Sequence, residues 1–404
     1  MLKVGKYEVK KQLKLSTLAL LILGSFNAYA NTNQLNEVGS AITQGDIDLD
    51  LRYRSEWVEQ DGFDDDALAN TLRARVTYES DSYKGFSFVT QLDTVVALGG
   101  EIYNSTTNGE INRPVVADPT GSDVNQGYLQ FQQEGWRFRA GRQRILLDDQ
   151  RFVGGVGWRQ NEQTYDGYRV TFSGTNAVTY DYSYLHNVNR IFGDDSPIGD
   201  LKGQIHLANV QYHPSNQHTI TAFGYFLDFD MLPALSTRTV GVRYQGKWQP
   251  FFVNASVANQ QEYRDNPNLI DTDYKMLELG VKAAGIQWTI GTEQLGAEQG
   301  VFSTPLATLH KFQGFADKFL GTPANGIVDN YFGVSGLLNR VKLAVKYHKL
   351  ESEQASINYG HEWDGTASFP LNNNVNGLLK IAHYSADQYA SDTTKLWFSV
   401  NATF

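Results

Sequence analysis

Arginine and lysine residues alternate with apolar residues over much of this 404-residue sequence. In a β-strand, successive side chains point to opposite faces of the sheet, so bases with this spacing would gather on one face. A guanidinium group binds a carboxylate or phosphate at two points, and a surface rich in arginine attracts anions. The residues with this spacing are Arg52, Arg54, Arg73, Arg75, Arg137, Arg139, Arg169, Arg243, Lys282, Lys342 and Lys346.

Acidic residues are fewer at the positions that share this face, although the whole chain has 44 acidic and 34 basic residues and a net charge of −10. An excess of bases on one enclosed surface would favour the passage of anions. The same bases could instead pair with acids on neighbouring strands and support the wall. The sequence allows both roles. The acids expected on this face are Asp48, Asp50, Glu79, Asp93, Asp181 and Glu278.

A further group of arginines lies in a glycine-rich segment that follows the strand beginning at Trp136. If this segment folds into the lumen of a barrel, it sets pore width and selectivity together. If it stays on the surface, its arginines would face the phosphates of lipopolysaccharide. These residues are Arg142, Arg144, Arg151 and Arg159.

These side chains are expected on β-strands, because the hydrophobic pattern has a period of two. Leu72, Ala74 and Val76, for example, alternate with Arg73 and Arg75. Such segments recur from Asp46 to the end of the chain, each about ten residues long, which is typical of transmembrane β-barrels. A soluble β-sandwich would need shorter strands and would not explain why aromatic residues recur near the strand ends.

The connections between the predicted strands alternate between short and long. Short turns are expected near residues 83–85, 134–135, 173–176, 213–216, 249–250, 284–285, 338–339 and 372–374. Longer loops are expected at about residues 98–123, 144–164, 188–204 and 295–328. The pattern predicts an all-β fold, an antiparallel up-and-down transmembrane barrel of about 18 strands with both termini in the periplasm. A barrel of that size is wide enough for an aqueous lumen.

Both ends of the chain suggest the bacterial outer membrane. Lysines precede an apolar run at residues 15–26, and Ala28-Tyr29-Ala30 follows, which is typical of a cleaved signal peptide. The run is shorter than the ~20 residues of a membrane-spanning helix. The final strand alternates and closes on Phe404, as the last strand of outer-membrane barrels does. We therefore expect a signal peptide at 1–30, a short periplasmic segment at 31–45 and the barrel at 46–404.

Two segments go beyond the general barrel pattern. The first is GRQRILLDDQRFVG at residues 141–154, followed by GWRQN from Gly157 and YDG from Tyr165. The second is FSTPLATLHKFQG at residues 302–314, followed by ADKF from Ala316 and TPANG from Thr322. Both are similar to segments of the alginate-export family of outer-membrane porins. The resemblance implies a monomeric barrel of about 18 strands with an arginine-lined lumen, through which an anionic polysaccharide such as alginate leaves the cell.

The leading prediction is therefore passive transport of an anionic solute. The solute would be an acidic polysaccharide or oligosaccharide that is exported, or a small organic anion that diffuses through a porin. An enzyme would need a nucleophile, a base and an orienting group together. The eight histidines, including His186 and His310 at outer positions, form no recognisable catalytic pattern. A structural barrel with a plugged lumen would show no conductance, so conductance separates it from a channel.

We expect no cofactor, no nucleic-acid partner and no metal site. Glu59, Asp61 and Asp64 to Asp66 form an acidic cluster, but it lacks the spacing and glycine of a calcium-binding loop. The expected partners are outer-membrane lipid, lipopolysaccharide and the anionic solute. We expect a monomer, and the sequence leaves a periplasmic partner protein open.

Overall fold

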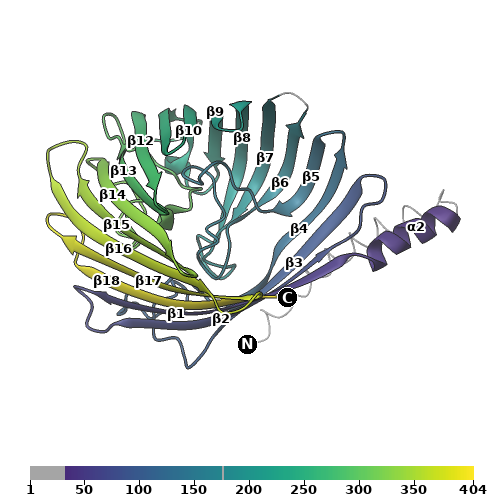
Figure 1. Cartoon of the computed structure of the whole chain (residues 1–404), viewed down its shortest axis with the longest axis horizontal. Coiled ribbons are helices and arrows are strands. Elements are labelled where there is room, and N and C mark those ends of the chain that lie inside the picture. Colours follow the sequence, from purple (N-terminus) through teal and green to yellow (C-terminus); the bar gives the residue numbers. More distant parts are fainter. Residues whose placement is uncertain (1–31, 175–176) are drawn as a thin grey trace.

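The computed structural model describes residues 32–174 and 177–404, so the predicted signal peptide lies outside the described residues. A helix, α2 (Thr32–Thr43), occupies the predicted periplasmic segment and extends away from a barrel of 18 strands (Figure 1). Along residues 32–404, with the gap noted, no helix is long and apolar enough to cross a membrane. The strands are β1 (Asp46–Gln60), β2 (Ala67–Glu79), β3 (Phe86–Ala97), β4 (Gly121–Gln133), β5 (Trp136–Gln143), β6 (Thr164–Ser173), β7 (Val178–Asn189), β8 (Asp200–Ser215), β9 (His218–Phe229), β10 (Thr237–Trp248), β11 (Phe251–Glu262), β12 (Asp271–Ala283), β13 (Ile286–Leu295), β14 (Ile327–Leu338), β15 (Val341–Glu351), β16 (Asn358–Pro370), β17 (Val375–Ala386) and β18 (Thr393–Thr403).

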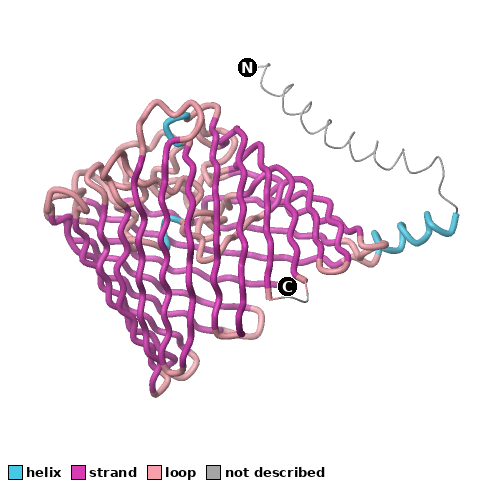
Figure 2. Tube along the Cα trace, turned by 90° about the horizontal axis from the view of Figure 1, so that it is seen from above, coloured by secondary structure: helices cyan, strands magenta, loops and turns pink. Residues whose placement is uncertain are grey.

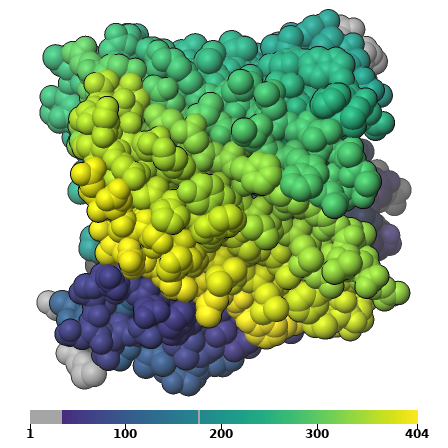
Figure 3. All heavy atoms as spheres, turned by 60° about the vertical axis from the view of Figure 1, so that its left-hand side comes forward, coloured from purple at the N-terminus to yellow at the C-terminus, as the bar shows by residue number. Residues whose placement is uncertain are grey.

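The sheet is closed. Each strand pairs antiparallel with its neighbours in sequence, and β1 also pairs with β18, so that Arg52 lies opposite Arg73 on one side and Asn401 on the other. Figure 3 shows the purple N-terminal strands lying directly beside the yellow C-terminal ones. Closure leaves no unpaired strand edge, which a bilayer would not tolerate. The predicted antiparallel up-and-down barrel of 18 strands is confirmed.

The outer face of the wall is apolar and exposed. On β12, Leu277 and Leu279 have exposed fractions of 44% and 43%, and Glu278 lies between them on the inner face. The same pattern exposes Tyr168 on β6 and Ile290 on β13. Apolar side chains around the outside of a closed barrel face lipid, and the alternate positions therefore face the lumen.

Short turns lie at one end of the barrel and longer loops at the other (Figure 2). Asp46 pairs with Glu79 beside the β2–β3 turn, and Thr403 donates from its backbone to Asn374 in the β16–β17 turn. Both ends of the barrel chain therefore lie at this short-turn end, which we expect to face the periplasm. The predicted short turns are all present, although the one near residues 173–176 lies partly outside the described residues.

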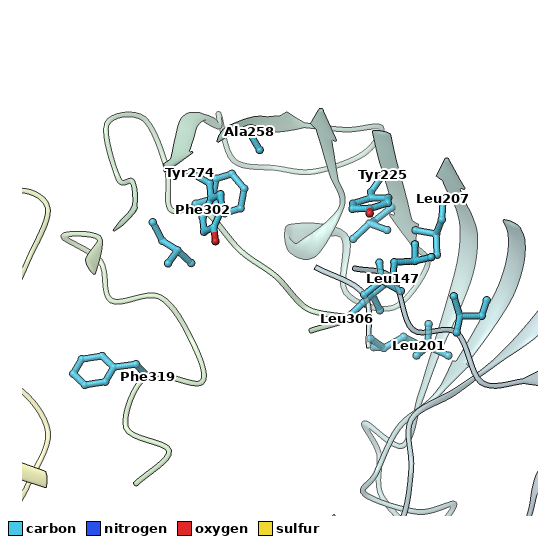
Figure 4. Packing of buried hydrophobic residues seen from close by; sticks show 14 of the residues in the cluster. Leu147, Leu201, Leu207, Tyr225, Ala258, Tyr274, Phe302, Leu306 and Phe319 are labelled. Carbon is cyan, nitrogen blue, oxygen red and sulfur yellow. The ribbon is translucent and has the colours of Figure 1, made fainter. Parts of the chain in front are cut away.

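Two of the longer loops fold into the barrel. The first inner loop, residues 144–163, joins β5 to β6, and the second inner loop, residues 296–326, joins β13 to β14. Leu147 of the first and Phe302 and Leu306 of the second pack in one buried cluster with Tyr225, which points inward from β9 (Figure 4). The apolar core of this barrel thus lies between the inner loops and the wall.

Candidate functional site

The two inner loops bind each other inside the lumen. Val153 and Leu306 form a parallel bridge, and the backbone nitrogen of Gly154 donates to Leu306 at 2.8 Å. The backbone nitrogen of Thr308 donates to Gln150 at 3.0 Å. The first inner loop is therefore in the lumen rather than on the surface, and the pair of loops narrows the channel as one unit.

Arg151 attaches the first inner loop to the wall. Its side chain is 1% exposed, and its Nε donates to Glu293 of β13 at 2.7 Å, while Nη1 donates to Thr304 of the second inner loop at 3.1 Å. Glu293 also accepts a hydrogen bond from Tyr274 at 2.7 Å. An arginine this deeply buried and paired with Glu293 is not accessible to a solute in the lumen. The structure gives Arg151 a supporting position, not one on the predicted solute path.

Arg159 has a similar position at the other end of this loop. Its Nη1 lies 3.0 Å from Glu56 on β1, and its Nη2 lies 3.1 Å from Asp317 in the second inner loop. Burial alone would lower the pKa of Arg159, but the charges of Glu56, Asp118 and Asp317 raise it above its ordinary value. Arg159 is therefore permanently charged and neutralised by its neighbours, and it too supports the loops and does not line the path.

Three arginines of β1 and β2 hold the backbone of the first inner loop. Arg52 donates to the carbonyls of Gly157 and Trp158 at 3.0 and 3.2 Å. Arg54 also donates to the carbonyl of Trp158 and lies 3.4 Å from Asp118. Arg73 donates to the carbonyl of Gln160 at 3.4 Å and also pairs with Asp50. The carbonyl groups of an irregular loop need donors when they are buried, and these guanidinium groups supply them.

Arg75 and Arg144 share one carboxylate. Arg75 binds Asp93 across the strand pair at 2.7 Å and Glu162 of the first inner loop at 3.1 Å, and Arg144 binds Glu162 at 2.9 Å. Burial would raise the pKa of Glu162, but the two arginines lower it below its ordinary value. Glu162 is therefore an anion at neutral pH, and it cancels part of the positive charge that the sequence predicts here.

Arg142 does not line the lumen, which corrects the sequence-based prediction. Successive residues of β5 alternate between two faces, and Arg142 belongs to the same face as Trp136 and Phe138, which are exposed to lipid. Arg137 and Arg139 belong to the opposite face. It lies where the loop leaves the wall, between Asp166 at 2.9 Å and Asp123 at 3.3 Å. It pairs within the wall near the long-loop end.

The remaining predicted bases lie on the inner wall. Arg243 pairs with Asp149, and Arg169 pairs with Asp181 at 3.0 Å. Lys346 lies 4.0 Å from the centre of the Tyr331 ring. Of the bases predicted from the sequence, those with no carboxylate within 4 Å among residues 32–174 and 177–404 are Arg52, Arg137, Arg139, Lys282, Lys342 and Lys346. The ones paired with carboxylates are Arg54, Arg73, Arg75, Arg142, Arg144, Arg151, Arg159, Arg169 and Arg243.

Two buried lysines, Lys380 and Lys395, were not expected from the sequence to lie at this site. Lys380 of β17 lies 2.7 Å from His310 and 3.1 Å from the centre of the Phe315 ring, and Lys395 of β18 lies 2.7 Å from Asp317. Both lysines hold the second inner loop. The inward position of Lys380 could have been predicted from the sequence, because Lys380 lies between Leu379 and Ile381, which face the lipid.

Within the described part of the chain, no group of three or more histidine, cysteine or acidic side chains is arranged to hold a metal ion. The acidic cluster of the first loop instead contacts Arg113, which lies 3.1 Å from Asp65.

A closed barrel of 18 strands, apolar outside and polar inside, has the architecture of the bacterial porins. Its unpaired bases and narrowing loops lie in the lumen, where a porin selects its solutes. The protein is accordingly a barrel of the bacterial outer membrane.

Comparison with solved structures gives the same class. The chain resembles Pseudomonas aeruginosa OccK3 (OpdO) with a TM-score of 0.68 and 10% identity, covering 92% of this chain and 99% of that one. It also resembles the P. aeruginosa outer membrane protein OpdK, with a TM-score of 0.69 and 13% identity over 89% of this chain and 98% of that one. A structure of OpdK with vanillate has a TM-score of 0.68 at the same identity and coverage.

Comparison of the sequence with known proteins does not assign the chain to a family. No protein-family model matches the chain, and no curated protein matches it. The comparisons thus support an outer-membrane porin fold and do not support the alginate-export family that the sequence resembles.

Proposed function

We propose that this protein is an outer-membrane channel for small organic anions, with carboxylates as its main solutes. The observation that carries the proposal is the set of lumen-facing bases without a carboxylate partner in the described residues, which includes Arg137, Arg139, Lys282, Lys342 and Lys346. Unpaired positive charge in a narrow, water-filled lumen raises the local concentration of anions and lowers the barrier to their passage.

The inner loops favour a small solute over a polymer. They are fixed inside the lumen by an apolar core and by buried ion pairs such as Arg151 with Glu293. A polymer would have to displace these contacts, whereas a small anion would pass beside them. The OpdK structure with vanillate supports this choice by analogy, because vanillate is an aromatic carboxylate.

Export of an acidic polysaccharide such as alginate is the second candidate. It rests on the resemblance of residues 141–154 and 302–314 to the alginate-export family. Both of these segments lie mainly in the inner loops, where they could contact a solute in the lumen. For either solute we propose a monomer that contacts lipopolysaccharide, because one chain closes its own lumen.

Efflux from proteoliposomes tests the proposal. Vesicles would be loaded with gluconate, with sorbitol as a neutral sugar alcohol of similar size, or with alginate oligomers. We expect gluconate to leave faster than sorbitol, and the oligomers to be retained. Equal efflux of gluconate and sorbitol would contradict an anion channel, and rapid efflux of the oligomers would favour polysaccharide export.

A further inference from the structure

Three arginines form a recess on the inner wall near the short-turn end, apart from the inner loops. The arginine recess has a volume of about 40 Å³ and is lined by Arg137 and Arg139 of β5 and by Arg169 and Thr171 of β6. In the register, Arg137 lies opposite Thr171 and Arg139 lies opposite Arg169. The four side chains therefore form two adjacent cross-strand pairs, and all of them lie on the lumenal face.

The charge of the recess is only partly neutralised. Arg169 donates from Nε and Nη2 to Asp181 on β7. Arg137 and Arg139 have only neutral partners among the described residues, because Arg137 Nε donates to Gln132 at 3.1 Å and Arg139 Nε donates to Gln130 at 2.8 Å. Of the three guanidinium groups, only that of Arg169 has a carboxylate partner among the described residues.

The geometry leaves the ends of the guanidinium groups available. The amides of β4 occupy the Nε atoms of Arg137 and Arg139, and in the described structure no hydrogen bond is made by the Nη atoms of either residue. The guanidinium group of Arg139 also lies over the ring of Tyr128, with its Cζ 4.7 Å from the ring centre, and this cation–π contact helps to hold it in place. Oriented pairs of N–H donors are the groups that bind a carboxylate at two points.

The arginines of the recess are not explained by a role in stabilising the barrel wall alone. Like charges directly opposite each other on neighbouring strands destabilise a sheet, and Arg139 faces Arg169 in that way. No residue of the recess bonds to an inner loop within the described residues, so these arginines do not hold the loops either. An anion between the opposing guanidinium groups would remove the repulsion.

We propose that the arginine recess is a binding site for one carboxylate group of a passing solute, at the short-turn end of the lumen. This proposal rests on the proposed function, because the solute must be an anion that enters the lumen. A volume of about 40 Å³ corresponds to roughly three water positions, which is enough for one carboxylate group but not for a whole solute. The remainder of the solute would stay in the water of the lumen.

The test is calorimetric titration of the full-length mature barrel in detergent micelles with gluconate, and with neutral sorbitol as the second ligand. The variant is R137Q together with R139Q. Its matched control is K282Q together with K342Q, which removes the same charge from lumen-facing positions near the short-turn end of β12 and β15. Because titration measures binding and not flux, this result is independent of whether the channel proves anion-selective in efflux.

We expect gluconate to bind the wild-type protein and sorbitol not to bind. The control should weaken gluconate binding only slightly, because it lowers the positive potential of the lumen without removing a direct contact. The arginine variant should bind gluconate about tenfold more weakly, the effect of losing one charge-assisted hydrogen bond. Absence of gluconate binding to the wild type would overturn the proposal. An equal loss in both double variants would also overturn it, since the lumen potential as a whole would then account for binding.

Thermal unfolding of R139Q separates binding from support. Removal of one of two opposed like charges should leave the unfolding midpoint unchanged or higher in the absence of ligand. A clearly lower midpoint would assign Arg139 to wall support and would count against the site.

Discussion

His310 lies between Lys380 and Asp317 and uses both of its ring nitrogens. Lys380 Nζ is 2.7 Å from Nε2, and Asp317 Oδ1 is 2.6 Å from Nδ1. A lysine ammonium can only donate, so Nε2 accepts a proton and Nδ1 donates one to the carboxylate. The imidazole is therefore neutral, and it joins the second inner loop to β17.

Replacing His310 by phenylalanine should release the second inner loop. The aromatic ring would keep the stacking against Trp158, whose ring centre is 4.8 Å away, but both hydrogen bonds would be lost. We expect stability to fall by about 1–3 kcal/mol, the cost of leaving a buried donor unpaired, and loop amides to exchange faster in hydrogen-exchange measurements. His361→Phe, at an exposed position of β16, is the control, and equal exchange in both variants would refute this role.

The same contact predicts a response to acid. Burial lowers the pKa of His310 from 6.5 to about 3. Because the folded pKa lies below the unfolded one, the stabilisation is complete above pH 6.5 and is lost as the pH falls toward 3, by about 1.4 kcal/mol per unit. The protection factors of amides in the second inner loop, which correct for the slower intrinsic exchange in acid, should fall between pH 6.5 and 4 in the wild type and change much less in His310→Phe. A loop equally protected at both pH values would contradict the assignment.

Breaking the buried pair of Arg151 and Glu293 should cost much more stability than breaking a surface ion pair. Arg151→Met would leave Glu293 buried without its cation, and we expect a loss of about 3–5 kcal/mol in urea unfolding. Arg113→Met removes an exposed partner of Asp65 and should cost less than about 1 kcal/mol. Adding Glu293→Gln to Arg151→Met should recover part of the loss, and failure to recover any would show that the pairing is not the cause.

Arg142 should have little influence on ion selectivity, because its guanidinium pairs with Asp123 and Asp166 in the wall. Arg142→Gln should leave the reversal potential in a salt gradient unchanged. Arg137→Gln removes the same charge from the lumenal face of the same strand and should shift the reversal potential. A shift of equal size in both variants would place Arg142 on the ion path after all.

Lys318 of the second inner loop predicts a response to alkali. Burial lowers its pKa to about 8, so its charge is present at pH 7 and is lost as the pH rises through 8. Anion selectivity should therefore weaken between pH 7 and pH 9, and the weakening should be smaller in Lys318→Met. If the variant shows the full response of the wild type, another group titrates in this range.

The strands and turns were predictable because their signals are local. The alternation of apolar and basic residues identifies the lumenal face, as at Arg137 and Arg139. The turns at Gly135 and Gly285 follow from residue type, since both have positive φ angles of 85° and 79°, which glycine adopts without strain. Counting alternate positions from Trp136 would also have placed Arg142 on the outer side.

The inner loops were not predictable in the same way, because their contacts join distant parts of the chain. Arg151 and Glu293 are separated by 142 positions, and Arg159 and Glu56 by 103. Without a periodic pattern, a loop arginine facing a solute and one paired inside the lumen look alike in sequence. The acids that neutralise them, including Glu56 and Asp317, were therefore not expected on the lumenal side.

Anion selectivity of the lumen can be measured as the reversal potential of single channels in a potassium chloride gradient. For the wild type we expect a potential on the anion-selective side, and a shift toward zero when Arg137, Arg139, Lys282 and Lys342 are changed together to glutamine. A cation-selective wild-type channel, or the absence of any conductance, would show that the lumen is not a path for anions.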